Sequence, residues 1–356
     1  MDRVYNFAAG PAVIPLPVLE RAQKELIVYG DTGMSVMEMS HRSAMYIAIY
    51  ERTEQSLREL MSIPDEYEVL FLQGGATLQF SAVPLNLNVT GKADYIDSGN
   101  FAYQAATEAA RYLTVNTIAS SREDTYTYVP DWRGKVNGDA DYMHITTNNT
   151  IYGTRYIELP EGNAPLVADM SSNILSEIYD VSKFGVIYAG AQKNIGPAGL
   201  TIVIVRKDLL GHASDICPKI MNWTLQVPEQ SMINTPNTYG IYMAGLCFDW
   251  LRDMGGIAAM EEINIKKAQL IYDFLDESKL FHGRAQSAYR SRMNITYTTG
   301  DTAIDDAFIE EAEKAGMVNL RGHRLAGGMR ASIYNAMPME GVEALVAFMK
   351  TFESKH

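Results

Sequence analysis

The sequence predicts an α/β protein with a mostly parallel sheet and helices on both faces, followed by a smaller α+β part. Short apolar runs alternate with helical stretches between residues 69 and 205, which favours a doubly wound sheet. Several of these runs are continuously apolar, as strands buried on both faces require. After residue 255 the pattern changes to helix, strand and helix.

Two helices are expected first, over 16–29 and about 43–61, because their apolar residues recur at helical spacing. A third is expected over 101–112. The expected strands are VLFL (69–72), ADYIDSG (93–99), VNTIAS (115–120), MHIT (143–146), PLVAD (165–169), GVIYAG (185–190) and LTIVIV (200–205).

The last hundred residues are expected to form a separate unit. They contain a long helix over about 256–278, a strand within 291–299, and helices over 305–315 and 340–353. We therefore predict a large domain over 1–255 and a small α+β domain over 256–356. The first 15 or so residues are expected to pack on the small domain or the active site.

The composition narrows the classes of function. A chain of 356 residues with 47% hydrophobic and 21% charged residues is typical of a globular protein. Its two cysteines, Cys217 and Cys247, follow no ligand-like pattern, so neither a disulfide framework nor a metal site is expected. The sequence shows no signal peptide and no membrane-length apolar run, which predicts a cytoplasmic protein. A net charge of −13 argues against a nucleic-acid partner.

The run Gly74-Gly75-Ala76-Thr77 follows the first expected strand. Two glycines allow a sharp turn, and the next backbone amides can point at a phosphate, with a hydroxyl from Thr77. A plain strand-to-helix turn explains the same residues. The run is neither the Rossmann fingerprint nor the phosphate loop ending in Gly-Lys-Ser/Thr.

Asp169 and Lys193 each follow an apolar strand. The carboxylate could cap the next turn, and the lysine could be a solvated loop residue. An amine in an apolar pocket has a lowered pKa, which a Schiff-base lysine needs. A phosphate cup, a strand-end carboxylate and a strand-end lysine are together the parts that hold pyridoxal 5′-phosphate (PLP).

Matching runs along essentially the whole chain make it resemble the phosphoserine aminotransferases, a class-V family of PLP-dependent transferase fold type I. These runs are FAAGPAVIP (7–15), VMEMSHRS (36–43), FLQGGATLQF (71–80), ADMSSNILS (168–176), YAGAQKNIGPAG (188–199), SMINTPNTY (231–239) and GHRLAGGMRASIYNAMP (322–338). The His-Arg-Ser run and the last run are the most specific to this family.

The resemblance implies cofactor roles for particular residues. Lys193 would form the imine with PLP, Asp169 would face the pyridine nitrogen, and Thr150 would bind the ring hydroxyl. Phe101 stands where the family often has a tryptophan stacked on the ring. A phenyl ring can still stack, with less overlap. The remaining contacts are Ala76, Thr77 and Gln192, with Asn234 and Thr235 reaching the phosphate of the neighbouring subunit in a homodimer with shared active sites.

The resemblance also implies how substrates bind. Arg330 matches the arginine that binds the substrate α-carboxylate. Two His-Arg pairs, His41-Arg42 and His323-Arg324, can bind a second anion through bidentate arginine contacts, although such a pair can also be a solvated surface dipeptide.

The implied reaction in serine biosynthesis interconverts L-glutamate and 3-phosphohydroxypyruvate with 2-oxoglutarate and O-phospho-L-serine. Family members also act on the phosphohydroxythreonine of vitamin B6 (pyridoxine) synthesis. Two alternatives stay open. One is another class-V aminotransferase or a cysteine desulfurase on the same fold, and the other is a non-catalytic protein that binds PLP or an anion.

Overall fold

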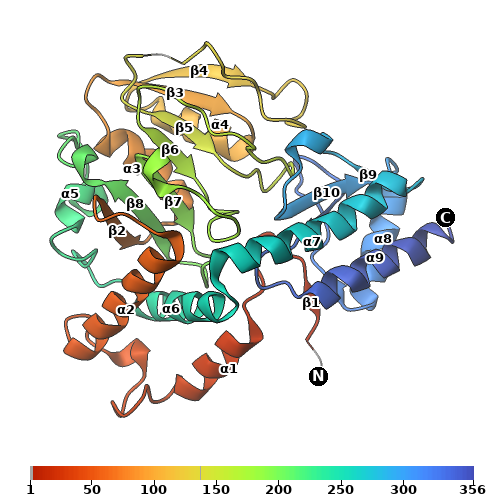
Figure 1. Ribbon diagram of the computed structural model, residues 1–356, viewed down its shortest axis with the longest axis horizontal. Helices are drawn as coiled ribbons and strands as arrows, with labels where there is room; N and C mark the ends of the chain where they lie inside the picture. Colours follow the sequence, from red (N-terminus) through yellow and green to blue (C-terminus); the bar gives the residue numbers. More distant parts are fainter. Residues whose placement is uncertain (1–2, 137) are drawn as a thin grey trace.

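The computed structural model describes residues 3–136 and 138–356, and its core is a seven-stranded sheet. The spatial order of the strands is β2-β8-β7-β6-β5-β3-β4. Their bounds are Tyr67–Leu72 (β2), Lys92–Asp97 (β3), Thr114–Ser120 (β4), Met143–Thr146 (β5), Leu166–Asp169 (β6), Val186–Gly190 (β7) and Thr201–Arg206 (β8). All seven runs predicted as strands therefore form this one sheet (Figure 1).

The sheet is mostly parallel, as the apolar runs predict. Strands β4, β3, β5, β6 and β7 pair in parallel, whereas β8 is antiparallel to both β7 and β2. Because β8 is antiparallel to both of its neighbours, β2 and β7 run in the same direction. The carboxyl ends of β2, β3, β5, β6 and β7 consequently lie at one edge of the sheet, which is where open α/β sheets bind ligands.

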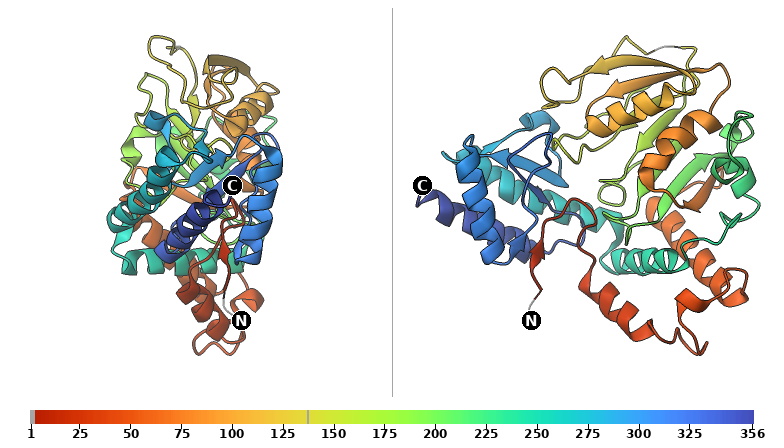
Figure 2. Two further views of the ribbon diagram at one scale, coloured as in Figure 1. Left: turned by 90° about the vertical axis from the view of Figure 1, so that its right-hand side faces the viewer. Right: turned by 180° about the vertical axis from the view of Figure 1, so that it is seen from behind.

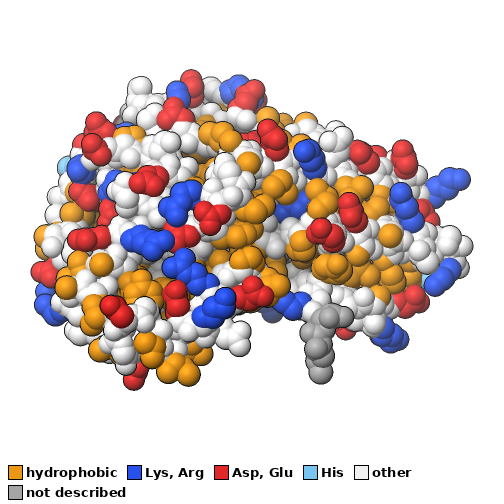
Figure 3. Space-filling model, turned by 60° about the horizontal axis from the view of Figure 1, so that its bottom comes forward, with side chains coloured by type: hydrophobic (Ala, Val, Ile, Leu, Met, Phe, Trp, Pro, Cys, Tyr) orange, Lys and Arg blue, Asp and Glu red, His pale blue; other side chains and the backbone are white. Residues whose placement is uncertain are grey.

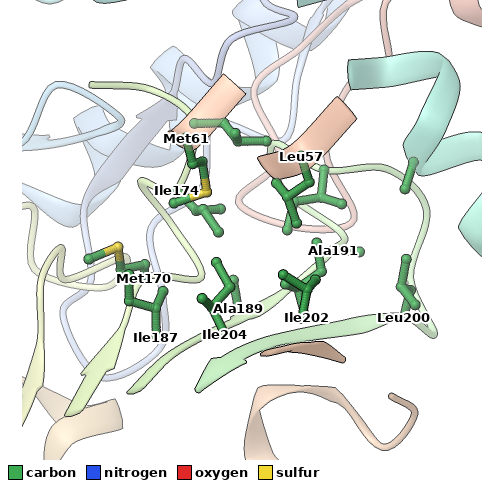
Figure 4. Packing of buried hydrophobic residues seen from close by; sticks show 14 of the residues in the cluster. Leu57, Met61, Met170, Ile174, Ile187, Ala189, Ala191, Leu200, Ile202 and Ile204 are labelled. Carbon is green, nitrogen blue, oxygen red and sulfur yellow. The ribbon is translucent and has the colours of Figure 1, made fainter. Parts of the chain in front are cut away.

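Helices cover both faces of this sheet. Side chains from α2 and α6 pack with Ile187, Ile202 and Ile204, while α3 and α4 pack with Tyr188 and Val203 on the opposite face. Figure 4 shows the first of these faces, where residues of β7 and β8 point toward Leu57 and Met61 of α2. The helices of this part are Leu16–Glu25 (α1), Ala44–Met61 (α2), Gly75–Asn86 (α3), Asn100–Ala109 (α4), Trp223–Gln226 (α5) and Thr238–Asp253 (α6).

The C-terminal part builds its own core around a three-stranded sheet ordered β12-β10-β9. Its elements are Gly256–Glu277 (α7), His282–Gly283 (β9), Asn294–Thr298 (β10), Thr302–Lys314 (α8), Met317–Val318 (β11), Met329–Ser332 (β12) and Met339–Glu353 (α9). The strand expected within 291–299 is shorter than that range, and the first helix ends at Glu25 rather than at 29. The division at residue 255 stays a prediction, and α7 begins at Gly256.

The N-terminal segment crosses from the C-terminal part to the large sheet. Strand β1 (Tyr5–Asn6) pairs in parallel with β11, and Phe7 is buried in the C-terminal core. Figure 2 shows this strand beside the C-terminal elements before the chain continues into α1. Residues 8–15 therefore span the space between the two cores.

The surface carries charges of both signs. On the face in Figure 3, acidic and basic side chains are interspersed with hydrophobic ones, so opposite charges offset each other locally. A search of the described residues finds no helix that is both long and apolar enough to span a membrane.

Candidate active site

A cavity of about 270 Å³ lies at the carboxyl edge of the large sheet. This volume is near the lower end of the roughly 300–1,000 Å³ typical of small-molecule sites. Larger hollows of about 1090 and 590 Å³ lie elsewhere, but neither contains Lys193 or Asp169. The described residues that line the 270 Å³ cavity are Ala9, Gly10, Gly75, Ala76, Thr77, Phe80, Phe101, Thr150, Ile151, Asp169, Ser171, Gln192, Lys193, His323 and Arg330.

Lys193 follows β7, and its amine is held inside this cavity. Its Nζ donates a hydrogen bond of 2.7 Å to Oγ1 of Thr150 and lies 5.7 Å from the centre of the Phe101 ring. Burial lowers the pKa of Lys193 to about 8, with Asp169 opposing and Arg330 adding to that shift. This position disfavours the solvated-loop alternative for the lysine, because the side chain is only partly exposed and its amine bonds Thr150 inside the cavity.

Asp169 is the last residue of β6 and is almost fully buried. Its Oδ1 accepts hydrogen bonds from the backbone N–H (2.9 Å) and the hydroxyl (2.6 Å) of Ser171. The turn-cap interpretation of Asp169 is thus correct for Oδ1, yet the same carboxylate also lines the cavity. Burial raises the pKa of Asp169, and the Ser171 hydrogen bonds and the charge of Lys193 oppose that rise. A cationic ring nitrogen beside the carboxylate would favour its ionised form further.

The glycine pair after β2 forms the turn that starts α3. Both Gly74 and Gly75 have positive φ, of 93° and 69°, and a Cβ on Gly74 would lie 2.4 Å from Leu78. Only glycine fits such a position without strain. The turn directs the first residues of α3, including Ala76 and Thr77, to the cavity. The free N–H groups and dipole of a helix N-terminus favour a bound anion there.

Arg330 enters the same cavity from β12 of the C-terminal part. Its Nη1 donates a 3.1 Å hydrogen bond to the carbonyl oxygen of Thr150. Burial lowers the pKa of Arg330, although an arginine keeps its charge near neutral pH. A guanidinium held by this hydrogen bond therefore faces the same cavity as the Lys193 amine.

His323 lies in a tight loop before β12. Its Nδ1 accepts a hydrogen bond of 3.2 Å from the backbone N–H of Leu325, so in the neutral ring Nε2 carries the proton. Burial, followed by the charges of Arg330 and Arg324, lowers the pKa of His323. The next residue, Arg324, is exposed and is not part of the cavity lining.

The other predicted site residues lie outside this cavity. His41 and Arg42 precede α2, and Arg42 is exposed. Asn234 and Thr235 are exposed in the loop before α6, where the carbonyl oxygen of Thr235 accepts a 3.0 Å hydrogen bond from Gln73. Of the four residues in the two His-Arg pairs, one copy therefore brings only His323 to this cavity, within the part of the chain that the structure describes.

The sequence indicates no individual role for three lining residues, Ser171, Ala9 and Gly10, although the first 15 or so residues are expected at the small domain or the active site. Ser171 fixes Asp169, as described above. Ala9 and Gly10 belong to the N-terminal segment, and a Cβ on Gly10 would lie 3.3 Å from Gln192 and 3.4 Å from Lys193. The Gly-Pro pair in the run FAAGPAVIP predicts an irregular backbone. Nothing in the run itself indicates the close approach to Lys193.

The lowered pKa of Lys193 gives a prediction for the ligand-free protein. Amine-selective labelling of Lys193, followed by peptide mass spectrometry, should increase as the pH rises through about 8, because the neutral amine is the reactive form. An ordinary lysine titrates near 10.5. The labelled peptide should be absent from Lys193→Ala. A labelling midpoint near 10.5 would contradict the buried position.

Comparison with known proteins identifies the family. The class-V aminotransferase family profile matches residues 4–345. The phosphoserine aminotransferase of Bacillus cereus is 55% identical to this chain, and the match covers 99% of each protein. That of Listeria monocytogenes is 52% identical, and the match covers 99% of this chain and 97% of the relative. The solved phosphoserine aminotransferase of Bacillus circulans subsp. alkalophilus superposes with a TM-score of 0.97 at 43% identity, over 100% of this chain and 99% of that one. A PLP-bound phosphoserine aminotransferase of Trichomonas vaginalis gives 0.94 at 40% identity, over 98% and 100%. The chain belongs to the class-V aminotransferase family.

Proposed function

We propose that this chain is a PLP-dependent phosphoserine aminotransferase. It interconverts L-glutamate and 3-phosphohydroxypyruvate with 2-oxoglutarate and O-phospho-L-serine. The observation that carries this proposal is one cavity that contains Lys193, Asp169 and Arg330 at the carboxyl edge of the sheet. The near full-length identity to phosphoserine aminotransferases supports the choice of substrate.

The cavity fits PLP group by group. The N-terminus of α3, with Ala76 and Thr77, suits the phosphate. The ring face of Phe101 can stack on a pyridine ring, and Asp169 can pair with a protonated ring nitrogen. When bound, PLP supplies an aldehyde for amines and an electron-withdrawing ring for the substrate α-carbon. Thr150, Gln192 and the neighbouring subunit's Asn234 and Thr235 complete the proposed contacts.

Lys193 performs the proton transfers in this proposal. Its pKa, lowered by burial to about 8, makes the neutral amine more accessible near neutral pH than that of an ordinary lysine, so its lone pair can remove the proton from the substrate α-carbon. The resulting ammonium can then return that proton to another atom in reach, as a general base and acid in turn. In the ligand-free protein, the hydrogen bond to Thr150 holds the amine inside the cavity.

Anionic groups of the substrate are divided between two sets of cations. Arg330 is fixed near Lys193 and suits the α-carboxylate shared by every substrate. The distal phosphate then faces His323 and Arg324, together with His41 and Arg42 of the partner subunit in a homodimer. A phosphate carries nearly two charges and three acceptor oxygens near neutral pH, so it can engage several of these donors at once.

The desulfurase alternative lacks a suitable nucleophile. Burial raises the pKa of Cys247 to about 12, and this residue lies in the core of the large sheet. Neither Cys247 nor Cys217 lines the cavity. Both cysteines are free, which supports the reducing cytoplasm as the place of the reaction.

Activity with phosphoserine tests the function directly. The PLP-loaded protein should transfer the amino group of phosphoserine to 2-oxoglutarate with a kcat/KM roughly thirty-fold to several-thousand-fold above that for serine, because serine leaves the distal cations unpaired. Borohydride reduction followed by peptide mapping should fix the cofactor to Lys193. A preference for alanine or aspartate would refute the substrate assignment but leave the PLP assignment intact.

Arginine substitutions should separate the two anion sites. Arg42→Ala and Arg324→Ala should lower kcat/KM for phosphoserine by roughly thirty-fold or more and affect glutamate less, since the γ-carboxylate has one charge and two oxygens. Arg330→Ala should impair both half-reactions. The exposed Arg111 offers a control, because Arg111→Ala should not change either half-reaction. Equal losses for both substrates in Arg42→Ala would contradict the distal role.

A mixing experiment tests whether the sites are shared between subunits. Lys193→Ala should be inactive and Arg42→Ala should keep only its residual activity with phosphoserine, but co-refolded heterodimers should contain one site with both residues intact. Random pairing makes half of the dimers mixed, so about a quarter of wild-type activity should return. If Arg42 served the site of its own chain, no activity would return, because both sites of a mixed dimer would be damaged.

A further inference from the structure

Helix α7 carries a buried amine that the reaction does not use. Lys267 has 0% relative exposure, and its Nζ donates hydrogen bonds to the carbonyl oxygens of Ile333 (3.1 Å), Tyr334 (2.9 Å) and Met337 (3.1 Å). An ammonium group has three donors, so all three are satisfied by one short stretch of backbone. Burial of a lysine is costly. This one binds three carbonyl oxygens of the chain directly after β12.

Asn264 lies one turn before Lys267 on the same face of α7 and is also fully buried. Its Nδ2 donates to the carbonyl oxygen of Ser176 (3.0 Å), in the segment after β6, and to Oδ1 of Asn335 (2.8 Å). The helix thus binds both the 333–337 segment and the chain that follows Asp169. Figure 1 shows α7 running from α6, beside the large sheet, toward β9 and β10.

The 333–337 segment in turn contacts two walls of the active site. The backbone N–H of Asn335 donates to Oδ1 of Asn194 (3.0 Å), the residue after Lys193. The hydroxyl of Tyr334 donates to the carbonyl oxygen of Ala9 (2.8 Å), which lines the cavity. At its other end the segment follows β12, which carries Arg330. This stretch of backbone therefore connects Asn194, which follows Lys193, with Ala9 of the N-terminal segment and, through β12, with Arg330.

We propose that Asn264 and Lys267 are positioning residues for amino transfer, which hold the 333–337 segment so that Arg330 and Lys193 keep a fixed separation. The inference rests on the proposed function, because this separation must match a substrate whose α-carboxylate and α-amino groups are on one carbon. Neither residue lines the cavity. Asn264 acts through Asn335, which bonds Asn194, and Lys267 acts through the carbonyl oxygens of the 333–337 segment.

The test compares Lys267→Gln with Lys266→Gln. Lys266 is the adjacent, exposed lysine of the same helix, so its variant removes the same charge without touching the 333–337 segment. With PLP saturating, Lys267→Gln should lower kcat for the phosphoserine half-reaction by roughly 10- to 100-fold, as about 1 Å of misplacement does. The visible circular dichroism of bound PLP should weaken, because its orientation is less fixed. Lys266→Gln should match the wild type in both measurements.

Asn264→Ala keeps the proposal testable if Lys267→Gln does not fold. It removes only neutral hydrogen bonds, so a smaller fall in kcat, of roughly 2- to 10-fold, is expected together with weaker dichroism. A folded, PLP-loaded Lys267→Gln or Asn264→Ala with wild-type kcat and dichroism would overturn the proposal, even if its unfolding midpoint fell. Inactivity of the wild type toward phosphoserine would instead refute the proposed function, and the dichroism would still report on the two residues.

Discussion

The burial of the Lys193 amine is the constraint on which the rest of the site depends. Enclosing an amine in a pocket penalises its charged form and lowers its pKa to about 8. This is tolerable because Thr150 accepts a hydrogen bond from it and the carboxylate of Asp169 is close enough to oppose the shift. The carboxylate alone is also unfavourable, since burial raises its pKa. Each buried group is thus made less costly by the other.

The topology of the sheet is what permits this arrangement. Asp169 ends β6 and Lys193 follows β7, and these neighbouring strands are parallel. Their carboxyl ends meet at one edge, where β5 delivers Thr150 and β2 delivers the Gly74-Gly75 turn. The antiparallel strand β8 does not disturb this, because β2 on its far side again points in the direction of β7. Residues far apart in sequence therefore face one cavity because each stands at or shortly after the carboxyl end of a strand.

Local apolar patterns predicted the strands of the sheet, whereas most of the residues expected at its edge came from the family resemblance. Each apolar run became a strand, and Ala76, Thr77, Phe101, Thr150, Asp169, Gln192, Lys193, His323 and Arg330 all line the cavity. Helix ends were less predictable: the helix expected over 16–29 ends at Glu25, although Leu26 and Ile27 are apolar. Those two side chains are exposed, at 40% and 80%, so one chain offers them too little packing to extend the helix. Contacts between distant segments, such as Gly10 with Lys193, have no local signature at all.

The positions that one chain leaves outside the cavity follow from the same geometry. The carboxyl edge supplies the amine, the carboxylate and the helix N-terminus, and β12 supplies Arg330 from the C-terminal core. Under the proposed function these groups bind the cofactor and the α-amino acid part of the substrate. The proposed distal phosphate needs additional cations, and Arg42 and Arg324 are exposed rather than buried in one copy. Long arginine side chains at the surface can reach a phosphate without burying further charges beside the sheet. In the proposed homodimer, substrate choice would then depend on surface arginines of two subunits, without altering the sheet that holds Lys193.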